Sequence, residues 1–368
     1  MPATKNDFFD DEQSIKTPFI IISDYLNLII KNLLNIMSAT SLLITNFLYQ
    51  GSDIRPCTIF TDVEPDDLLA MMIFFTNCKP LTSVQIVISA WTNQTQRAHF
   101  LTMFLVRHFP HLKFKIFLGM GNEKEYDMSN ILSCFPSTSA VQQYPHWTDA
   151  TFHPHEFYLQ MAPAQEIREL YRQHKDFSAS TIAIYGSFNI RSLLNKSNEL
   201  AVEFETMFNS FQKVLYYENF PASAPEYVQD VKITTALASI PMIGELLKWW
   251  NELIFEECKI DTHQEWAVKI MDSIQSCPYQ FVNADTGLVM TLLMSIDAIP
   301  HLVTGVLDLP KSDIESGHYR PYPEIQHIRR SDAGIEQFLS VNTGDINIKM
   351  KHRELMDDTM RTIAGCFS

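Results

Sequence analysis

The sequence lacks any pairing or close spacing of its cysteines. Six cysteines are spread over 368 residues, with no Cys-x-x-Cys and no spacing typical of a zinc site. Neither a disulfide framework nor a structural zinc is indicated, and free thiols in a reducing compartment are expected. The first residues also lack the basic start and compact apolar stretch of a secretory signal. We therefore expect a cytoplasmic protein.

An excess of positive charge is also lacking. The chain has 28 basic and 43 acidic residues, a formal net charge of −15, and its basic residues are scattered. Binding to nucleic acid generally requires a basic face on the protein. We therefore expect no nucleic-acid partner.

Long uninterrupted apolar runs are absent as well. Residues 18–50 carry apolar side chains at helical spacing, but Asp24, Lys31 and Asn32 are among the polar residues that interrupt them. A bilayer crossing needs a predominantly apolar stretch of about 20 residues. A transmembrane span is one interpretation of this segment. We favour the other, an amphipathic helical extension that packs on the main domain, and expect no membrane span.

What the sequence does contain is an alternation of short apolar runs and helical patterns. It predicts a disordered lead over 1–17, the helical extension over 18–50, an α/β domain over 56–325 and a C-terminal tail over 326–368. Strands are predicted at 58–60, 83–90, 114–118, 180–185 and 213–217, helices at 68–75, 95–109, 164–174 and from about 189, an irregular insertion over 122–160, and mostly helix over 230–300. Strands that alternate with helices favour a doubly wound, mainly parallel sheet.

The most informative stretch is an acidic cluster between the first predicted strand and the first predicted helix of this domain. It contains Asp62, Glu64, Asp66 and Asp67. Ligands of open α/β sheets bind where strands end and turn into helices. Carboxylates that are packed together repel one another unless a cation lies between them, and several hard oxygen ligands favour calcium or magnesium. The alternative is an acidic helix start that stabilises the helix and binds nothing.

Polar residues also follow the other predicted strands. Asn93 comes after the second strand, Asn189 after the fourth and Asn219 after the fifth, and Asp285 precedes an apolar helix much later in the chain. The carboxyl ends of parallel strands share one rim of the sheet. We therefore expect these side chains to converge on the acidic cluster.

These residues resemble a known family. The acidic cluster resembles the N-terminal signature of the nucleoside hydrolases of the inosine/uridine-preferring type, Asp-x-Asp-x-x-x-Asp-Asp-Ala, in which Asp62 matches the second aspartate and Asp66-Asp67 the closing pair. Residues 184–190 resemble the Gly-x-Thr-Asn turn of that family. Asn93 stands where the family has a Gly-Asn, and Asp285 matches its late aspartate. The resemblance extends over about residues 56–300 and implies a sheet of nucleoside-hydrolase type.

The resemblance implies a calcium-dependent hydrolase that cleaves the N-glycosidic bond of a nucleoside or a related ribosylated compound. Asp62, Asp67, Asp285 and the backbone carbonyl of Phe188 would bind Ca²⁺. Asp62 would be the base that deprotonates the calcium-bound water. The substrate-binding residues would be Asp66, Asn93, Asn189, Asn219 and Glu226. The implied partner is a small-molecule nucleoside or ribosylated substrate. The sequence also allows the protein to form a homo-oligomer.

The sequence also departs from the family pattern. Phe60 replaces the first aspartate, Ala284 stands where the family often has a histidine that assists the leaving base, and Glu226 lacks the asparagine that accompanies it. Two alternatives therefore stay open. One is a catalytically altered protein that binds a ligand or a partner on the same scaffold. The other is an unrelated α/β hydrolase that uses the carboxylates with magnesium, for example on phosphoesters.

Overall fold

The structure of the chain is a computed structural model. It describes residues 49–50, 53–54, 56–77, 83–90, 93–121, 143–153, 155–174, 176–186, 189, 198–218, 231–260, 285–293, 302–307, 328–329, 338–342 and 346–367. The disordered lead and nearly all of the helical extension predicted from the sequence lie outside these residues and stay predictions.

The centre of the fold is a sheet with nine strands in the described part of the chain. The strands are β3 (Cys57–Thr61), β4 (Val84–Ile88), β5 (Phe114–Leu118), β6 (Phe157–Gln160), β7 (Thr181–Tyr185), β8 (Lys213–Glu218), β9 (Leu302–Leu307), β10 (Ile328–Arg329) and β11 (Phe338–Asn342). Their order across the sheet is β10-β9-β11-β8-β7-β6-β3-β4-β5. All neighbouring pairs from β11 to β5 are parallel, whereas β9 and β10 add antiparallel pairs at the other edge. Two short strands, β1 (Tyr49–Gln50) and β2 (Asp53–Ile54), form a separate antiparallel pair.

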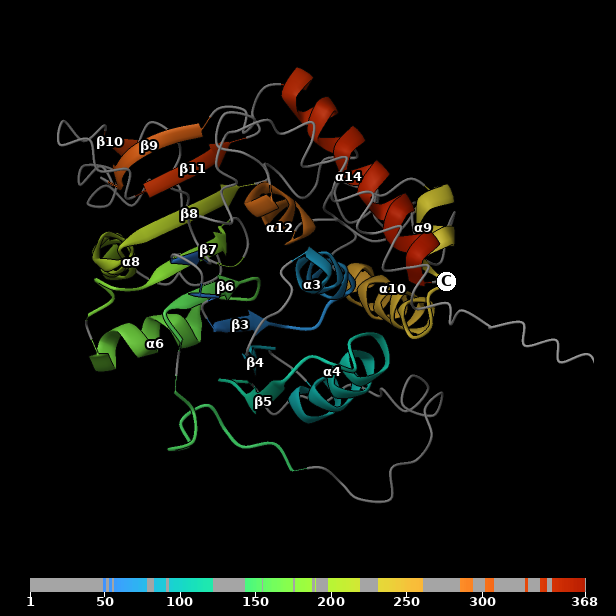
Figure 1. Ribbon diagram of the computed structural model, residues 1–368, viewed down its shortest axis with the longest axis horizontal. Coiled ribbons are helices and arrows are strands. Elements are labelled where there is room, and N and C mark those ends of the chain that lie inside the picture. The colour runs from blue at the N-terminus through green and yellow to red at the C-terminus, as the bar shows by residue number, and fades with distance from the viewer. Residues whose placement is uncertain are drawn as a thin grey trace, which may run out of the picture. The chain divides into compact units, whose positions relative to one another are not determined.

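Helices cover both faces of this sheet, as Figure 1 shows. The helices are α3 (Pro65–Asn77), α4 (Gln94–His108), α6 (Gln165–His174), α8 (Asn198–Ser210), α9 (Val231–Leu237), α10 (Ile243–Ile260), α12 (Asp285–Leu293) and α14 (Ile346–Phe367). One apolar cluster joins α6 and α8 to the sheet, and a larger one joins α3, α4, α10, α12 and α14 to the opposite face. This is the doubly wound α/β arrangement expected from the sequence.

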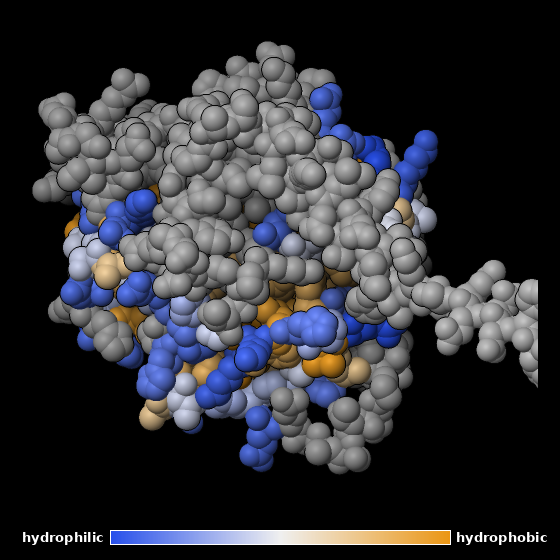
Figure 2. Space-filling view, viewed as in Figure 1, coloured by the Kyte–Doolittle hydropathy of each residue, from blue (hydrophilic) through white to orange (hydrophobic). Residues whose placement is uncertain are grey.

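The strands carry apolar residues toward both faces. Along β3, Ile59 belongs to the larger cluster and its neighbour Phe60 to the smaller one, and along β8 Leu215 and Tyr216 divide in the same way. Successive side chains of a strand point to opposite faces, so a strand covered on both sides has no polar alternation. Figure 2 shows hydrophilic residues over much of the described surface and apolar residues gathered toward its centre.

One strand of the sheet was missed by the sequence analysis. The residues 122–160 were expected to be an irregular insertion, but β6 occupies 157–160 and lies between β3 and β7. All four residues of β6 are buried. A fully buried strand of this length has no period-2 signature, and the aromatic and histidine residues before it are typical of a loop. The expectation of irregular structure was therefore wrong at its C-terminal end.

The C-terminal residues 326–368 supply β10, β11 and α14. β11 pairs with β8 in parallel and with β9 in antiparallel, so it lies inside the sheet. The domain boundary placed before these residues stays a prediction. Among the described helices, none is both long enough and apolar enough to cross a bilayer.

Candidate functional site

The candidate site lies at the carboxyl ends of the central parallel strands. β3 ends at Thr61, the turn that follows contains Asp62, and α3 begins at Pro65 with Asp66 and Asp67 in its first turn. α12, which begins at Asp285, packs against α3 and against β7 and β8. Two helix starts that are far apart in sequence therefore meet at the same rim.

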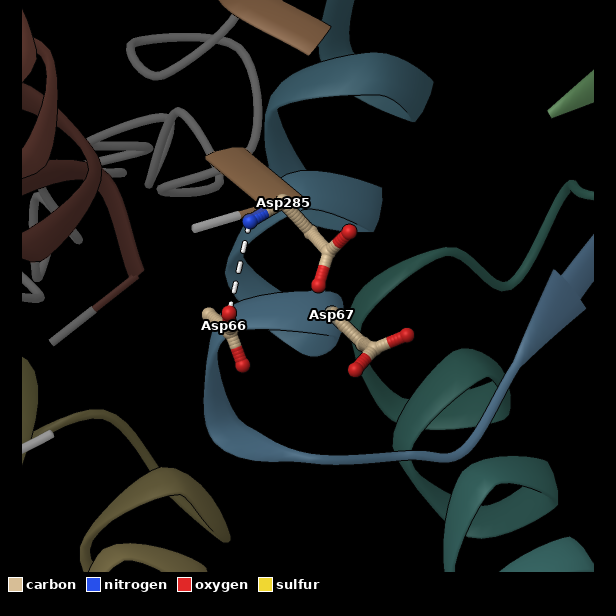
Figure 3. A group of neighbouring side chains, drawn as sticks. All are labelled: Asp66, Asp67 and Asp285. Carbon is tan, nitrogen blue, oxygen red and sulfur yellow. Dashed lines mark hydrogen bonds between the residues drawn. The ribbon is translucent and has the colours of Figure 1, made fainter. Parts of the chain in front are cut away.

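Three carboxylates converge there. Oxygen atoms of Asp66, Asp67 and Asp285 all lie within 4.8 Å of one another, and all three residues are buried. Figure 3 shows the three side chains close together at the starts of α3 and α12. The backbone N–H of Asp285 donates a hydrogen bond to Oδ2 of Asp66, with the two atoms 3.3 Å apart. As expected from the sequence, Asp285 therefore lies beside Asp66 and Asp67.

Asp67 is held in place by hydrogen bonds from two neighbouring residues. The hydroxyl of Thr61 donates to its Oδ1 at 2.6 Å, and the backbone N–H of Glu64 donates to its Oδ2 at 3.2 Å. The carboxyl of Asp62 lies next to that of Asp67, and each affects the pKa of the other. Asp62 therefore adjoins the three-residue group through Asp67.

Burial and mutual repulsion raise the pKa of these groups. For Asp67 the removal of water is the largest cause, followed by the charges of Asp62 and Asp285, and its pKa lies well above the ordinary value. The pKa of Asp285 is raised well above its ordinary value by burial and then by Asp66. Burial also raises the pKa of Asp62, while the hydrogen bond from Asp67 and the charge of Arg97 oppose it. Four neighbouring carboxyls cannot all be charged here without compensation.

A divalent cation fits this set of residues. Oδ1 of Asp285 is buried and has no hydrogen-bond partner among the described residues, and an oxygen of this kind is costly to bury alone. The donors are all hard carboxylate oxygens, which are the ligands that calcium and magnesium prefer. A cation of charge +2 would also reverse the pKa shifts described above and keep the carboxyls ionised.

Two other predicted site residues lie at the same rim. Asn93 precedes α4 in a left-handed conformation with φ 54°, is buried, and donates from its side chain to Oε1 of Gln96. Asn189 is buried beyond the end of β7. Its side-chain amide donates to the carbonyl of Met161 at 2.6 Å, and its own carbonyl accepts from the N–H of Ala164 at 3.1 Å. Asn189 therefore ties the turn after β7 to the turn after β6.

The remaining predicted residues fall outside the described residues. These are Phe188, Asn219, Glu226 and Ala284. Their roles as a carbonyl ligand, as substrate-binding residues and as the replacement of a histidine stay predictions.

The structure adds two charged residues that the sequence analysis did not select. Arg97 of α4 is buried and donates to the backbone carbonyl of Asp62. Glu166, in the first turn of α6, is buried and accepts from the N–H of Met120 in the turn after β5. Arg97 lies on the same apolar stripe of its helix as Leu101 and Phe104. A charged residue within an apolar stripe is the sequence signal that could have identified it. Glu166 carries no comparable signal, because acidic residues are common in the first turn of a helix.

Comparison with known proteins places the fold. No protein-family model and no curated protein matches the sequence. Among solved structures, a plant nucleoside hydrolase is 12% identical with a TM-score of 0.50, and the match covers 83% of this chain and 99% of that one. An inosine–guanosine nucleoside hydrolase is 12% identical with a TM-score of 0.48, and the match covers 84% of this chain and 98% of that one. The chain therefore has an α/β fold of nucleoside-hydrolase type, with a buried group of three aspartates at its rim.

Proposed function

We propose that this protein is a calcium-dependent hydrolase that cleaves the N-ribosyl bond of a nucleoside or a related ribosylated compound. The observation that carries the proposal is the group formed by Asp66, Asp67 and Asp285, whose oxygens lie within 4.8 Å of one another at the starts of two helices. The rim of a doubly wound sheet is where such folds bind their ligands. The fold similarity to a plant nucleoside hydrolase supports the choice of substrate class.

The proposed cation site consists of these carboxylates together with Asp62. All of the donors are oxygen, which argues against zinc and in favour of calcium or magnesium. The resemblance to the family in the acidic motif favours calcium. When bound, the cation would orient a water molecule and lower its pKa into the range where a carboxylate can deprotonate it.

Asp62 is the proposed base. It retains partial exposure to solvent, in contrast to the fully buried Asp67. With the cation bound, its carboxyl would stay ionised and could accept a proton. In the proposed step the water oxygen forms a bond to the anomeric carbon, while the bond from that carbon to the nitrogen of the nucleobase breaks. The water proton passes to the Asp62 carboxylate, and the leaving nitrogen takes the electron pair of the broken bond.

The proposed sugar contacts come from the same rim. The side chain of Asn93 is held against Gln96, so its amide has a fixed orientation before substrate arrives. Asn189 keeps its amide on Met161, and its contribution is to hold two turns of the rim in place. Fixed polar groups of this kind reduce the cost of ordering a bound sugar.

A nucleoside panel tests the proposal. Purified protein with calcium is incubated with purine and pyrimidine nucleosides, and free ribose is measured with a reducing-sugar assay. Wild type is expected to release ribose from at least one of them, and Asp62→Asn is expected to lose most of that activity. The exposed Asp149 supplies the matched control Asp149→Asn, which should behave as wild type. Tight nucleoside binding without ribose release, or release of phosphate from phosphoesters with magnesium, would contradict the proposal.

A further inference from the structure

Arg97 places a permanent positive charge inside the protein. Its exposed fraction is 4%, and its neighbours on the buried side of α4 include Ala98 and Leu101. A guanidinium group does not lose its proton under ordinary conditions. Burying it is costly unless its charge and its N–H groups meet suitable partners. The partners of Arg97 therefore indicate what this charge does.

Two of these partners are defined. Nη1 of Arg97 donates to the backbone carbonyl oxygen of Asp62 at 2.5 Å, across 35 residues of sequence. The guanidinium carbon also lies 5.4 Å from the ring centroid of Trp249 on α10, a distance at which an aromatic face attracts a cation. The guanidinium thus contacts both the acidic turn and an aromatic ring.

The turn that Arg97 contacts is strained. Val63, the residue after Asp62, has φ 61°, which is unusual for a β-branched residue and persists only where neighbouring groups enforce it. The N–H of Val63 donates to the Thr61 hydroxyl at 3.0 Å, and Glu64 is tied to Asp67. Arg97 supplies a third tie, from a different helix. Three hydrogen bonds therefore hold the turn that contains Asp62.

We propose that Arg97 is a positioning residue for Asp62 and a built-in counter-ion of the carboxylate group. It fixes the strained turn and offsets part of the negative charge, so that the site is formed before a divalent cation binds. This inference rests on the proposed cation site. A resident positive charge opposes the entry of a second one, so the same residue weakens calcium binding while it stabilises the calcium-free protein.

The test compares calcium binding in three variants by thermal unfolding and calorimetry. Arg97→Gln removes the charge and leaves a shorter polar side chain, whereas Arg97→Lys keeps the charge. Arg168→Gln is the matched control, because Arg168 pairs with Glu203 on the opposite face of the sheet. In chelator Arg97→Gln is expected to melt below wild type. With calcium its rise in melting temperature should exceed that of wild type, and its calcium Kd should be lower by about tenfold. Arg97→Lys should keep the wild-type values. Arg168→Gln should leave the calcium-induced rise in melting temperature and the calcium Kd unchanged.

Other outcomes decide against the inference. An equal calcium-induced rise in Arg97→Gln and wild type would show that Arg97 only packs. An Arg97→Gln protein that stays unfolded at saturating calcium would also contradict the inference, because calcium would then fail to replace the lost positive charge. Because the readout is calcium binding, it separates the two proposals: a larger rise without ribose release contradicts the proposed function alone. Ribose release with an unchanged rise contradicts the role of Arg97 alone.

Discussion

The backbone N–H of Asp285 donates a hydrogen bond to the carboxylate of Asp66, although 219 residues separate the two in sequence. This contact joins the start of α12 to the start of α3. Both helices direct the positive ends of their dipoles toward the carboxylates, which partly compensates the charge buried there. The remaining repulsion within the group makes its stability sensitive to cations and to substitution.

The effect of Asp285→Asn on the melting temperature is expected to have opposite signs in chelator and in calcium. In chelator, the variant removes one of several buried carboxyls that repel one another, so its melting temperature should rise above that of wild type. With calcium, wild type should gain stability and the variant should gain little, because it has lost a ligand. At a calcium concentration of 100 times Kd the gain is about 2.7 kcal/mol, and each kcal/mol corresponds to about 2–4 °C in a large domain. Scanning calorimetry in both buffers measures this.

Asp149→Asn is the control for that experiment, since Asp149 is exposed on a loop. It should follow wild type in both buffers. An Asp285→Asn variant that gains as much from calcium as wild type would contradict the assignment of Asp285 to the cation site.

Thr61→Val should destabilise the protein by about 1–3 kcal/mol, as expected when buried polar groups lose their partner. The Thr61 hydroxyl donates to Asp67 and accepts from the N–H of Val63, and valine keeps the shape without either bond. Thr206→Val removes an exposed hydroxyl that donates to the carbonyl of Val202 in its own helix, and should cost less than about 0.5 kcal/mol. Urea unfolding gives both values, and equal costs would contradict the role of Thr61.

Glu166→Gln should flatten the pH dependence of stability. Burial is the main cause that raises the pKa of Glu166 above its ordinary value of 4.5. The folded protein then keeps a proton that the unfolded chain releases, so this residue contributes full stability below pH 4.5. That contribution falls as the pH rises through the folded pKa. Unfolding of wild type and variant is measured in chelator from pH 4 upward. The free energy of unfolding of wild type should fall relative to that of the variant as the pH rises.

Glu203→Gln serves as a comparison, because Glu203 should affect the pH dependence of stability in the opposite direction to Glu166. Burial acts to raise the pKa of Glu203, but hydrogen bonds from Arg172 and Arg168 outweigh it and the pKa is lowered. Its contribution to stability is present above the unfolded pKa and is lost as the pH falls. The same trend for both variants would contradict the account of Glu166.

Gly186→Ala should destabilise the turn after β7. An added Cβ at Gly186 would overlap the ring of Tyr216, and overpacking of this kind costs about 1–3 kcal/mol. Gly365→Ala is the matched control, because a Cβ there meets nothing within 4 Å in the part of the chain that the structure describes. Its helical position should gain about 0.5–1 kcal/mol from the substitution. Equal effects of the two variants in urea unfolding would contradict the close packing at Gly186.

The sequence predicted the framework of the fold well because its signals are local. The apolar run at 114–118 matches β5, and the periodic stretch at 95–109 matches α4 to within one residue at each end. β6 was missed because a short strand that is buried on both faces has no alternation. The position of β11 inside the sheet was not foreseen either, since pairing between strands is set by tertiary contacts and leaves no mark in the strand itself.

The site was predictable only in part, for a similar reason. Asp62, Asp66 and Asp67 form a local motif, and the resemblance to a family pointed to Asp285 as their distant partner. The structure brings Asp66 into the group that could hold a cation, whereas the resemblance implied a role on the ribose for it. Arg97 reaches the site through a backbone carbonyl. Contacts of a side chain with a distant backbone depend on the fold and cannot be recognised from residue types.

Calcium binding and ribose release can be followed in the same sample. Calcium is titrated into chelator-treated protein with the best nucleoside of the panel, while calcium occupancy and free ribose are measured at each step. We expect both to rise with the same midpoint and Asp67→Asn to abolish both. Ribose release that is equally fast in chelator, or calcium binding that is never accompanied by ribose release, would contradict the proposed function.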